Sequence, residues 1–364
     1  MTGFHYADRL DRARKEMAKH DVDVLLASVG SDLPYLTGYR AMPLERLTMA
    51  VIPQRGEPVL VVPELEAARV TEVAGAFDVR PWSETDNAIG LVARLIGRAK
   101  NAMVTDQTWA VFLLALQDEL PGTAFRSARP LTEALRVIKE PGEIELLRRA
   151  GASADVVAGL LTVHDFAGKT EAQVSREVAA MLEANGTDAA GFAIVASGPN
   201  GASPHHEAGE RIIGDGDAIV VDFGGTVGGY GSDTTRMYHV GEPSARYREV
   251  HEIVLVAQEA AVAAVAPGVA AELVDAAARE VIAAAGYGEF FIHRTGHGIG
   301  LDGHEDPYIV SGNTQLLKAG MAFSIEPGIY LPGEFGVRIE DIVVCSEDGA
   351  DRLNHSPRQV AVVG

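Results

Sequence analysis

Residues 218–237 read AIVVDFGGTVGGYGSDTTRM, and this stretch predicts a β-hairpin that carries one aspartate on each strand. An apolar run ends at Asp222, the pairs Gly224-Gly225 and Gly228-Gly229 form a glycine-rich turn, and Asp233 opens the return strand. Apolar strands joined through glycines are typical of hairpins, so the two carboxylates can lie side by side. Buried carboxylates repel each other unless a cation lies between them. Taken alone, the pattern also fits ordinary turn aspartates, which glycine-rich loops favour.

Three further runs of unusual composition follow in the last third of the chain. His297 lies between two glycines, whose small size keeps the backbone close to whatever the ring contacts. Glu326 ends an apolar strand that Pro327 stops, and Glu340 follows Arg338 at the spacing of one strand face. Each strand could simply be half solvated, with its charges facing water. Two strands that each direct a glutamate the same way favour a shared cation instead.

Together these runs supply four carboxylates and one imidazole. The residues are Asp222, Asp233, His297, Glu326 and Glu340. This oxygen-rich set suits one or two divalent ions of the Mn, Co or Zn type rather than a structural zinc bound by thiolates. Two such ions can polarise a carbonyl and supply a hydroxide at neutral pH. The sequence therefore predicts a metal-dependent hydrolytic site.

The order of the five residues, with their flanks, resembles that of the pita-bread-fold metallopeptidases, family M24. Within this family the similarity is to the Xaa-Pro branch, which comprises prolidase, aminopeptidase P and creatinase. It is carried by Ser203-Pro204-His205, by His304-Glu305 and by Gly336-Val337-Arg338-Ile339-Glu340-Asp341. The resemblance is strong over about residues 140–364 and weak before them. It implies a creatinase-type α/β N-terminal domain followed by an α+β pita-bread catalytic domain with an internal pseudo-twofold repeat.

The resemblance also implies a role for each metal ligand. Asp222 and Glu340 would be shared between two divalent ions, with Mn²⁺ expected ahead of Co²⁺ or Zn²⁺. Asp233 would bind one ion, and His297 with Glu326 the other. Glu326 matches the family glutamate that also accepts the proton of the water between the metals.

On the substrate side, the resemblance assigns His205 to stabilisation of the tetrahedral intermediate. Its neighbour His206 lies outside the Pro-His match and is the weaker candidate for that role. The residues implied in substrate binding are His293, His304, Arg338 and, with a weaker match, Tyr330. The two histidines would line the proline-side pocket, with ordinary loop histidines as the alternative interpretation. Arg338 would hold either the metal ligands or a substrate carboxylate.

These roles imply metal-dependent hydrolysis of the imide bond before proline, in dipeptides or short peptides. Proline makes that bond tertiary and leaves it without an N–H. A dipeptidase must bind the free carboxylate after proline, whereas aminopeptidase P must leave that side open. The short loop at residues 331–335 and cationic donors from His293, His304 and Arg338 favour an Xaa-Pro dipeptidase. A creatinase-like small-molecule hydrolase and a catalytically inactive binding module on the same fold are further alternatives. The complete ligand set counts against both.

The composition limits the classes of protein to consider. A chain of 364 residues, 47% of them hydrophobic, is long enough for two domains. Its net charge of −20 argues against nucleic acid or an anionic membrane as a partner. The single cysteine, Cys345, excludes an internal disulfide, and neither a secretory leader pattern nor a membrane-spanning apolar run is present. We therefore expect a cytoplasmic protein, and the resemblance implies a homodimer that acts on short proline-containing peptides.

Prolines and glycines predict a domain boundary between Pro130 and Pro141-Gly142. Residues 1–135 alternate helical and strand patterns without a catalytic cluster, so we expect an α/β domain with a structural, dimer-forming or site-capping role. Residues 136–364 would form the catalytic domain, in which two helices followed by strands occur twice. The expected helices lie near 143–163, from 170 onward, 245–266 and 270–285, and the strands near 192–196, 218–222, 320–326 and 336–345.

Overall fold

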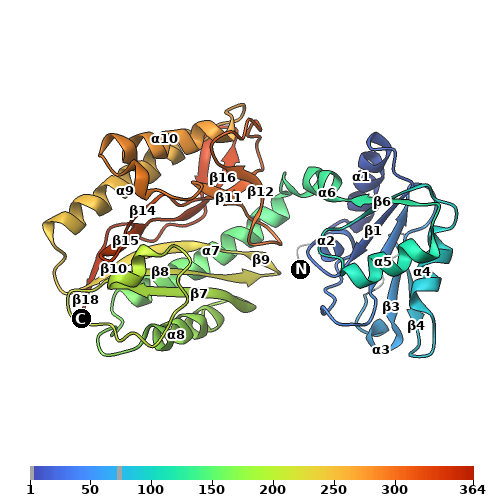
Figure 1. The fold of residues 1–364 in the computed structure, drawn as a ribbon, viewed down its shortest axis with the longest axis horizontal. Coiled ribbons are helices and arrows are strands. Elements are labelled where there is room, and N and C mark those ends of the chain that lie inside the picture. The colour runs from blue at the N-terminus through green and yellow to red at the C-terminus, as the bar shows by residue number, and fades with distance from the viewer. Residues whose placement is uncertain (1–3, 72–75) are drawn as a thin grey trace. The chain divides into compact units, whose positions relative to one another are not determined.

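The computed structural model describes residues 4–71 and 76–364, and the chain divides into two units, Met1–Arg136 and Val137–Gly364 (Figure 1). Each unit has its own sheets and its own apolar core. Within the described ranges, every helix is too short or too polar to cross a bilayer.

The N-terminal unit is the α/β domain that the sequence predicts. Its six strands form one sheet in the order β4-β3-β2-β1-β5-β6. The strands are β1 (Val24–Ser28), β2 (Met49–Pro53), β3 (Val59–Pro63), β4 (Asp78–Trp82), β5 (Asn101–Val104) and β6 (Ala124–Ser127). The helices are α1 (Tyr6–Lys19), α2 (Asp32–Thr37), α3 (Glu64–Ala67), α4 (Ala88–Ile96), α5 (Ala110–Glu119) and α6 (Arg129–Arg136). Helices α4 and α5 are joined to the sheet by one core, in which Val92 and Leu116 share a cluster with Val51.

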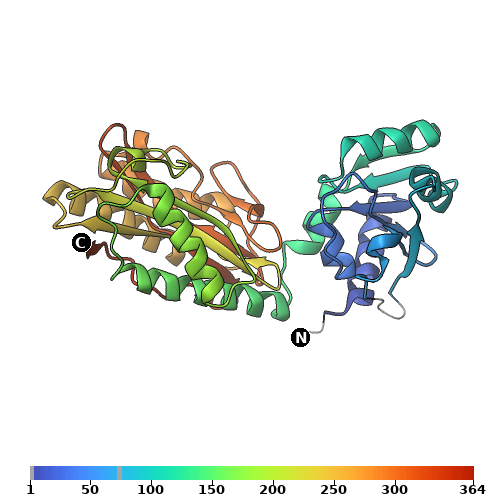
Figure 2. The ribbon, with the colours of Figure 1, turned by 90° about the horizontal axis from the view of Figure 1, so that it is seen from below.

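The C-terminal unit begins with two capped helices and a sheet. The elements are α7 (Pro141–Leu161), α8 (Glu171–Ala184), β7 (Ala189–Ser197), η1 (Gly198–Ala202), β8 (Ala218–Val227), β9 (Tyr230–Gly231) and β10 (Thr234–Val240). A capping box of Thr170 and Gln173 starts α8, the helix expected from residue 170 onward. Figure 2 shows α7 and α8 on one face of this sheet, where Val157 and Val178 share a core with Val221.

The second half of this unit repeats the order of two helices and then strands, as predicted. The elements are α9 (Ala245–Ala263), α10 (Ala271–Ala284), η2 (Gly288–Phe290), β11 (Gly296–Gly298), β12 (Glu305–Ile309), β13 (Ala322–Ile325), β14 (Gly328–Leu331), β15 (Phe335–Arg338), β16 (Asp341–Ser346), β17 (Gly349–Arg352) and β18 (Ala361–Val363). Isolated bridges pair Thr170 with Ile212 just before α8 and Ala270 with Leu316 just before α10. These equivalent bridges show that the two halves start their second helices in the same way.

The single strand expected at residues 336–345 is in fact two strands. β15 pairs only with β14, whereas β16 pairs with β13 and β17 in a different sheet. Glu340 lies at the break between them, where its backbone N–H donates to the carbonyl of Thr235, 3.3 Å away, on β10. The chain thus changes sheets at the residue that is predicted to bind metal.

One prediction concerns a buried histidine in this unit. Burial lowers the pKa of His251, on α9, from 6.5 to about 4. As the pH falls below 6.5, His251 becomes protonated in the unfolded chain but stays neutral in the folded chain. The contribution of this histidine to stability is therefore fully present above pH 6.5 and is lost as the pH falls towards 4. Between pH 7 and 4.5 we expect the free energy of unfolding to fall by about 2–3 kcal/mol less in His251→Gln than in wild type.

This is measured as the free energy of unfolding by far-UV circular dichroism. Tryptophan fluorescence is unsuitable because Trp82 and Trp109 both lie in the N-terminal unit. Parallel pH profiles of variant and wild type would show that His251 is not the group responsible.

Candidate active site

The structure brings the five predicted ligands together from separate elements of the C-terminal unit. Asp222 lies in β8, and Asp233 immediately precedes β10 on the other side of the predicted hairpin. His297 is the central residue of β11. Glu326 follows the last residue of β13, and Glu340 lies at the break between β15 and β16.

The ligand atoms form overlapping groups. Oxygens of Asp222, Asp233 and Glu340 lie within 4.8 Å of one another, as do ligand atoms of His297, Glu326 and Glu340. Glu340 is therefore common to both groups. His297 Nε2 lies 3.2 Å from Glu326 Oε1 and 3.7 Å from Asp233 Oδ2.

Burial makes this concentration of charge unfavourable without a cation. It raises the pKa of Asp222, Asp233 and Glu340, and repulsion from Asp222 raises the pKa of Asp233 further. Burial also disfavours charge on His297 and Glu326, but their hydrogen bond outweighs it. The pKa of His297 rises to about 9, and that of Glu326 falls to about 2.

The residues present fit divalent ions. Asp222 Oδ1 is buried and has no hydrogen-bond partner among the described residues, although it belongs to a group of three carboxylates. An orphaned carboxylate oxygen in such a group is satisfied by a cation. A metal bound by His297 would replace the proton on its ring nitrogen, because a histidine ligand must be neutral. The mixture of carboxylates with one imidazole suits Mn, Co or Zn.

Arg338 lies behind the ligands and is 3% exposed. Its Nη2 donates to Asp222 Oδ2 at 2.7 Å, and its Nε donates to Thr235 Oγ1 at 3.1 Å. Thr235 Oγ1 in turn donates to Glu340 Oε2 at 2.7 Å. Nη1 of the arginine donates to the hydroxyl of Tyr330 at 2.9 Å. These contacts favour the first of its two predicted roles, holding the ligands, over contact with a substrate carboxylate.

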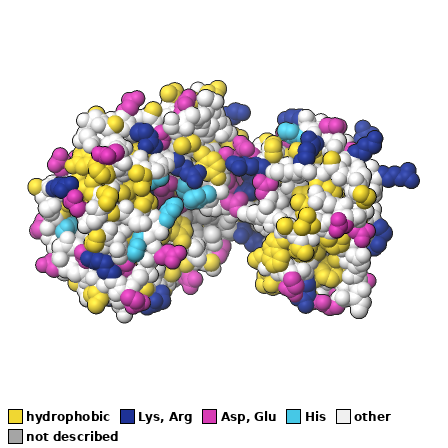
Figure 3. Space-filling model, viewed as in Figure 1, with side chains coloured by type: hydrophobic (Ala, Val, Ile, Leu, Met, Phe, Trp, Pro, Cys, Tyr) yellow, Lys and Arg dark blue, Asp and Glu magenta, His cyan; other side chains and the backbone are white. Residues whose placement is uncertain are grey.

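The predicted substrate-side residues lie around a cavity of about 360 Å³. All five ligands line it, together with His205, His293, His304 and Arg338. Tyr330 is buried beside it, and its hydroxyl lies 2.8 Å from His293 Nε2. Figure 3 shows histidine side chains gathered on one face of the C-terminal unit.

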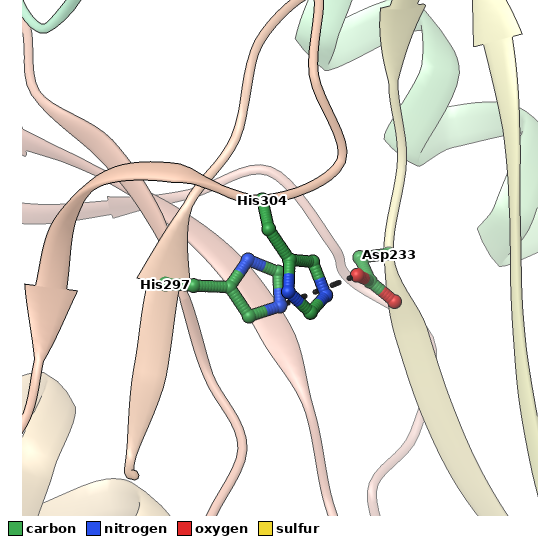
Figure 4. Close-up of side chains that lie close together, drawn as sticks. All are labelled: Asp233, His297 and His304. Atoms are coloured by element: carbon green, nitrogen blue, oxygen red, sulfur yellow. Dashed lines mark ion pairs between the residues drawn. The ribbon is translucent and has the colours of Figure 1, made fainter. Parts of the chain in front are cut away.

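His304 stacks against His297, with ring centroids 3.8 Å apart and planes at 25° (Figure 4). Figure 4 also shows Asp233, which immediately precedes β10, facing the two rings. Burial and the charge of His297 lower the pKa of His304 to about 4. His304 is therefore neutral at pH 7 and can accept or donate one hydrogen bond at the cavity wall.

Four lining residues are absent from the site predicted from the sequence: Phe192, Ile194, Arg294 and Gly303. Phe192 and Ile194 alternate along β7, and Ile194 stands opposite Asp222 in the sheet register. The sequence shows the alternation along this strand, but it does not show that the strand pairs with the one that carries Asp222. Arg294 follows the predicted His293, and its guanidinium lies 4.4 Å from the ring centroid of Tyr308.

Comparisons with known proteins identify the family of the chain. Residues 145–347 match a model of metallopeptidase family M24, and residues 9–138 match the creatinase/prolidase N-terminal domain. The chain is 47% identical to the probable dipeptidase PepE of Mycobacterium tuberculosis, over 98% of this chain and 96% of that protein. It is 34% identical to the Xaa-Pro dipeptidase of Lactobacillus helveticus, over 97% and 98% of the two chains. The crystal structure of a prolidase from Thermococcus sibiricus has a TM-score of 0.95 at 38% identity, with both chains covered completely.

Proposed function

The chain belongs to metallopeptidase family M24, and on that premise we propose that it hydrolyses the Xaa-Pro bond of dipeptides or short peptides as an Xaa-Pro dipeptidase. The observation that carries the proposal is the cavity itself, which collects a complete ligand set and three histidines within one small volume. A cavity of about 360 Å³ has the size of a small-molecule site. Relatives named Xaa-Pro dipeptidase and prolidase support the substrate class.

We assign the five ligands to two divalent ions, with Mn²⁺ ahead of Co²⁺ or Zn²⁺. Bound there, the ions would polarise the scissile carbonyl and lower the pKa of an attacking water. Glu340 belongs to both groups of ligand atoms, which supports its shared role. Asp233 would hold one ion, and His297 with Glu326 would hold the other. Asp222 completes the carboxylate group that also contains Asp233 and Glu340.

The protein residues supply the proton transfers and the orientation. Glu326 accepts the proton of the attacking water, and Ser324 holds its Oε1 through a hydrogen bond of 3.0 Å. The same serine oxygen accepts the backbone N–H of His297 at 3.0 Å, so one hydroxyl orients the base and a ligand strand together. His205 donates to the oxygen that becomes negative as the carbonyl is attacked. His293 and His304 pack around the proline ring.

The free carboxylate after proline distinguishes a dipeptidase from aminopeptidase P. Burial lowers the pKa of His293 and His304, so these histidines are not the cationic donors that the sequence predicts. Arg294, which lines the cavity, can supply the charged donor instead. A carboxylate contact with a charged donor contributes roughly 1.5–3 kcal/mol. We therefore expect kcat/KM for Ala-Pro amide to be at least about tenfold lower than for Ala-Pro.

The measurement compares Ala-Pro, Ala-Pro amide and a longer Xaa-Pro peptide side by side. If the amide and the longer peptide were hydrolysed as fast as Ala-Pro, the result would favour aminopeptidase P. Metal analysis of the purified protein separates the remaining candidates, because a creatinase-like hydrolase or an inactive module would not need two ions for its action.

We further propose that the enzyme is a cytoplasmic homodimer whose partners are short proline-containing peptides rather than nucleic acid. The net charge of −20 disfavours polyanionic partners, and the lone Cys345 is buried and unpaired, as suits a reducing compartment. Light scattering after size-exclusion chromatography tests the dimer. A monomer that retains full activity would overturn that part of the proposal.

A further inference from the structure

A buried carboxylate outside the ligand cluster, that of Glu171, is directed at the loop that carries His205. Glu171 is the first residue of α8, and its side chain is 0% exposed. It accepts hydrogen bonds from the backbone N–H and hydroxyl of Ser197, both at 2.7 Å, and from Asn200 Nδ2 at 3.0 and 3.1 Å. It also lies 2.8 Å from His206 Nε2. One carboxylate thus ties down both ends of the segment 197–206.

The same segment is held from its other side by the strand that leads to the ligands. Arg338 Nη1 donates to the carbonyl of Pro204 at 3.3 Å. Gly201 lies against Gly336 so closely that a Cβ at Gly336 would come within 1.9 Å of the Gly201 carbonyl oxygen. The residues on both sides of His205 are therefore fixed, His206 to Glu171 and Pro204 to Arg338.

His205 itself is exposed on this loop and lines the cavity. Within the described residues, no hydrogen bond to its ring is recorded, so its orientation depends on the backbone that its neighbours fix. We infer that Glu171 and His206 form a positioning pair that holds His205 at the reacting carbonyl. This inference rests on the proposed function, because it requires His205 to act in Xaa-Pro hydrolysis.

The direction of the hydrogen bond follows from the chemistry of the acceptor. Burial raises the pKa of Glu171, but the bonds from Ser197, His206 and Asn200 lower it below its usual value. An ionised carboxylate has only acceptors, so His206 Nε2 carries the proton between them. A glutamine at position 206 can place an amide N–H near that nitrogen, whereas leucine cannot.

The test is a double-mutant cycle on turnover of Ala-Pro. We expect His206→Leu to lower kcat by about 10- to 100-fold, because small displacements of a reacting group are that costly. His206→Gln should keep most of the activity. In a His205→Ala background, His206→Leu should cost less than about twofold more, since the group that it positions is already gone. A full additional loss in that background, or equal losses for glutamine and leucine, would overturn the inference.

Controls separate positioning from folding and from the proposed function. His164 makes a matched histidine–carboxylate pair with Glu177, 3.0 Å apart and outside the residues that line the cavity, so His164→Leu should leave kcat unchanged. Metal content and thermal midpoint are measured for every variant. If His206→Leu does not fold, His206→Asn replaces it, because the shorter amide cannot reach Glu171. An inactive wild type would contradict the proposed function, whereas an active wild type with additive losses would contradict the positioning pair alone.

Discussion

Replacing Asp233 by Asn is expected to abolish Xaa-Pro hydrolysis, with a loss of at least about 10³-fold in kcat, because loss of an outer-shell partner alone already costs about 10–100-fold. An amide offers one acceptor oxygen and a donor in place of two acceptors, and its N–H₂ would point at a cation. Oxygens of Asp233 lie within 4.8 Å of those of Asp222 and Glu340 and, in another group, of the nitrogens of His297 and His304. Each other ligand of the described site already has its own position, so none of them can substitute for the carboxylate of Asp233.

The fold of this variant should persist. Asp233 lies outside the regular ladder of β10, whose backbone pairs with β8 from Thr234 onward. The change also removes one of three buried carboxylates that repel one another, so it does not destabilise the metal-free protein. We expect wild type to gain thermal stability on addition of Mn²⁺ and the variant to gain less.

Metal content by elemental analysis, the melting temperature with and without Mn²⁺, and kcat on Ala-Pro together check this prediction. The matched control is Asp215→Asn, an exposed aspartate in the same unit that does not line the cavity. Full turnover by the Asp233 variant, or by wild type after exhaustive chelation, would contradict a two-metal mechanism.

The ligand set could be identified from the sequence because each member stands at a local break in pattern. Asp222 follows an apolar run within β8, Glu326 follows the last residue of an apolar strand, and His297 is flanked by glycines. A charged residue directly after an apolar run can be recognised from its neighbours in the sequence, without knowledge of any tertiary contact. The repeated order of helices and strands was visible for the same reason.

The parts that depend on tertiary pairing could not be predicted. The run 336–345 alternates polar and apolar residues up to Glu340, and the apolar run 342–345 follows Asp341. This change of pattern is local, but it does not tell which strands pair on either side of it, so the transfer of the chain from one sheet to another stays hidden in the sequence. Glu171 looks like an ordinary acidic residue in a helical first turn, a position that acidic side chains favour for its dipole. Only the folded chain shows that it is fully buried and bound to His206. The choice of His205 over His206 likewise rested on resemblance alone.

Replacing His205 by Ala is expected to lower kcat by roughly 10²–10³, about 2.7–4 kcal/mol, as for the loss of one donor to a developing oxyanion. Metal content should not change, because His205 is outside the groups of ligand atoms. The fold should also tolerate the change, since the side chain is exposed and the loop is held by its neighbours.

The kinetic signature is specific. Loss of a donor that acts on the transition state lowers kcat and kcat/KM together, whereas loss of a donor to the ground-state peptide raises KM. Steady-state kinetics on Ala-Pro at saturating Mn²⁺ separates the two. His206→Ala should cost less than His205→Ala, because the neighbour acts only through the loop. If instead the His206 variant were the slower enzyme, with intact metal content and fold, then His206 would be the residue that contacts the substrate and His205 would be part of the wall.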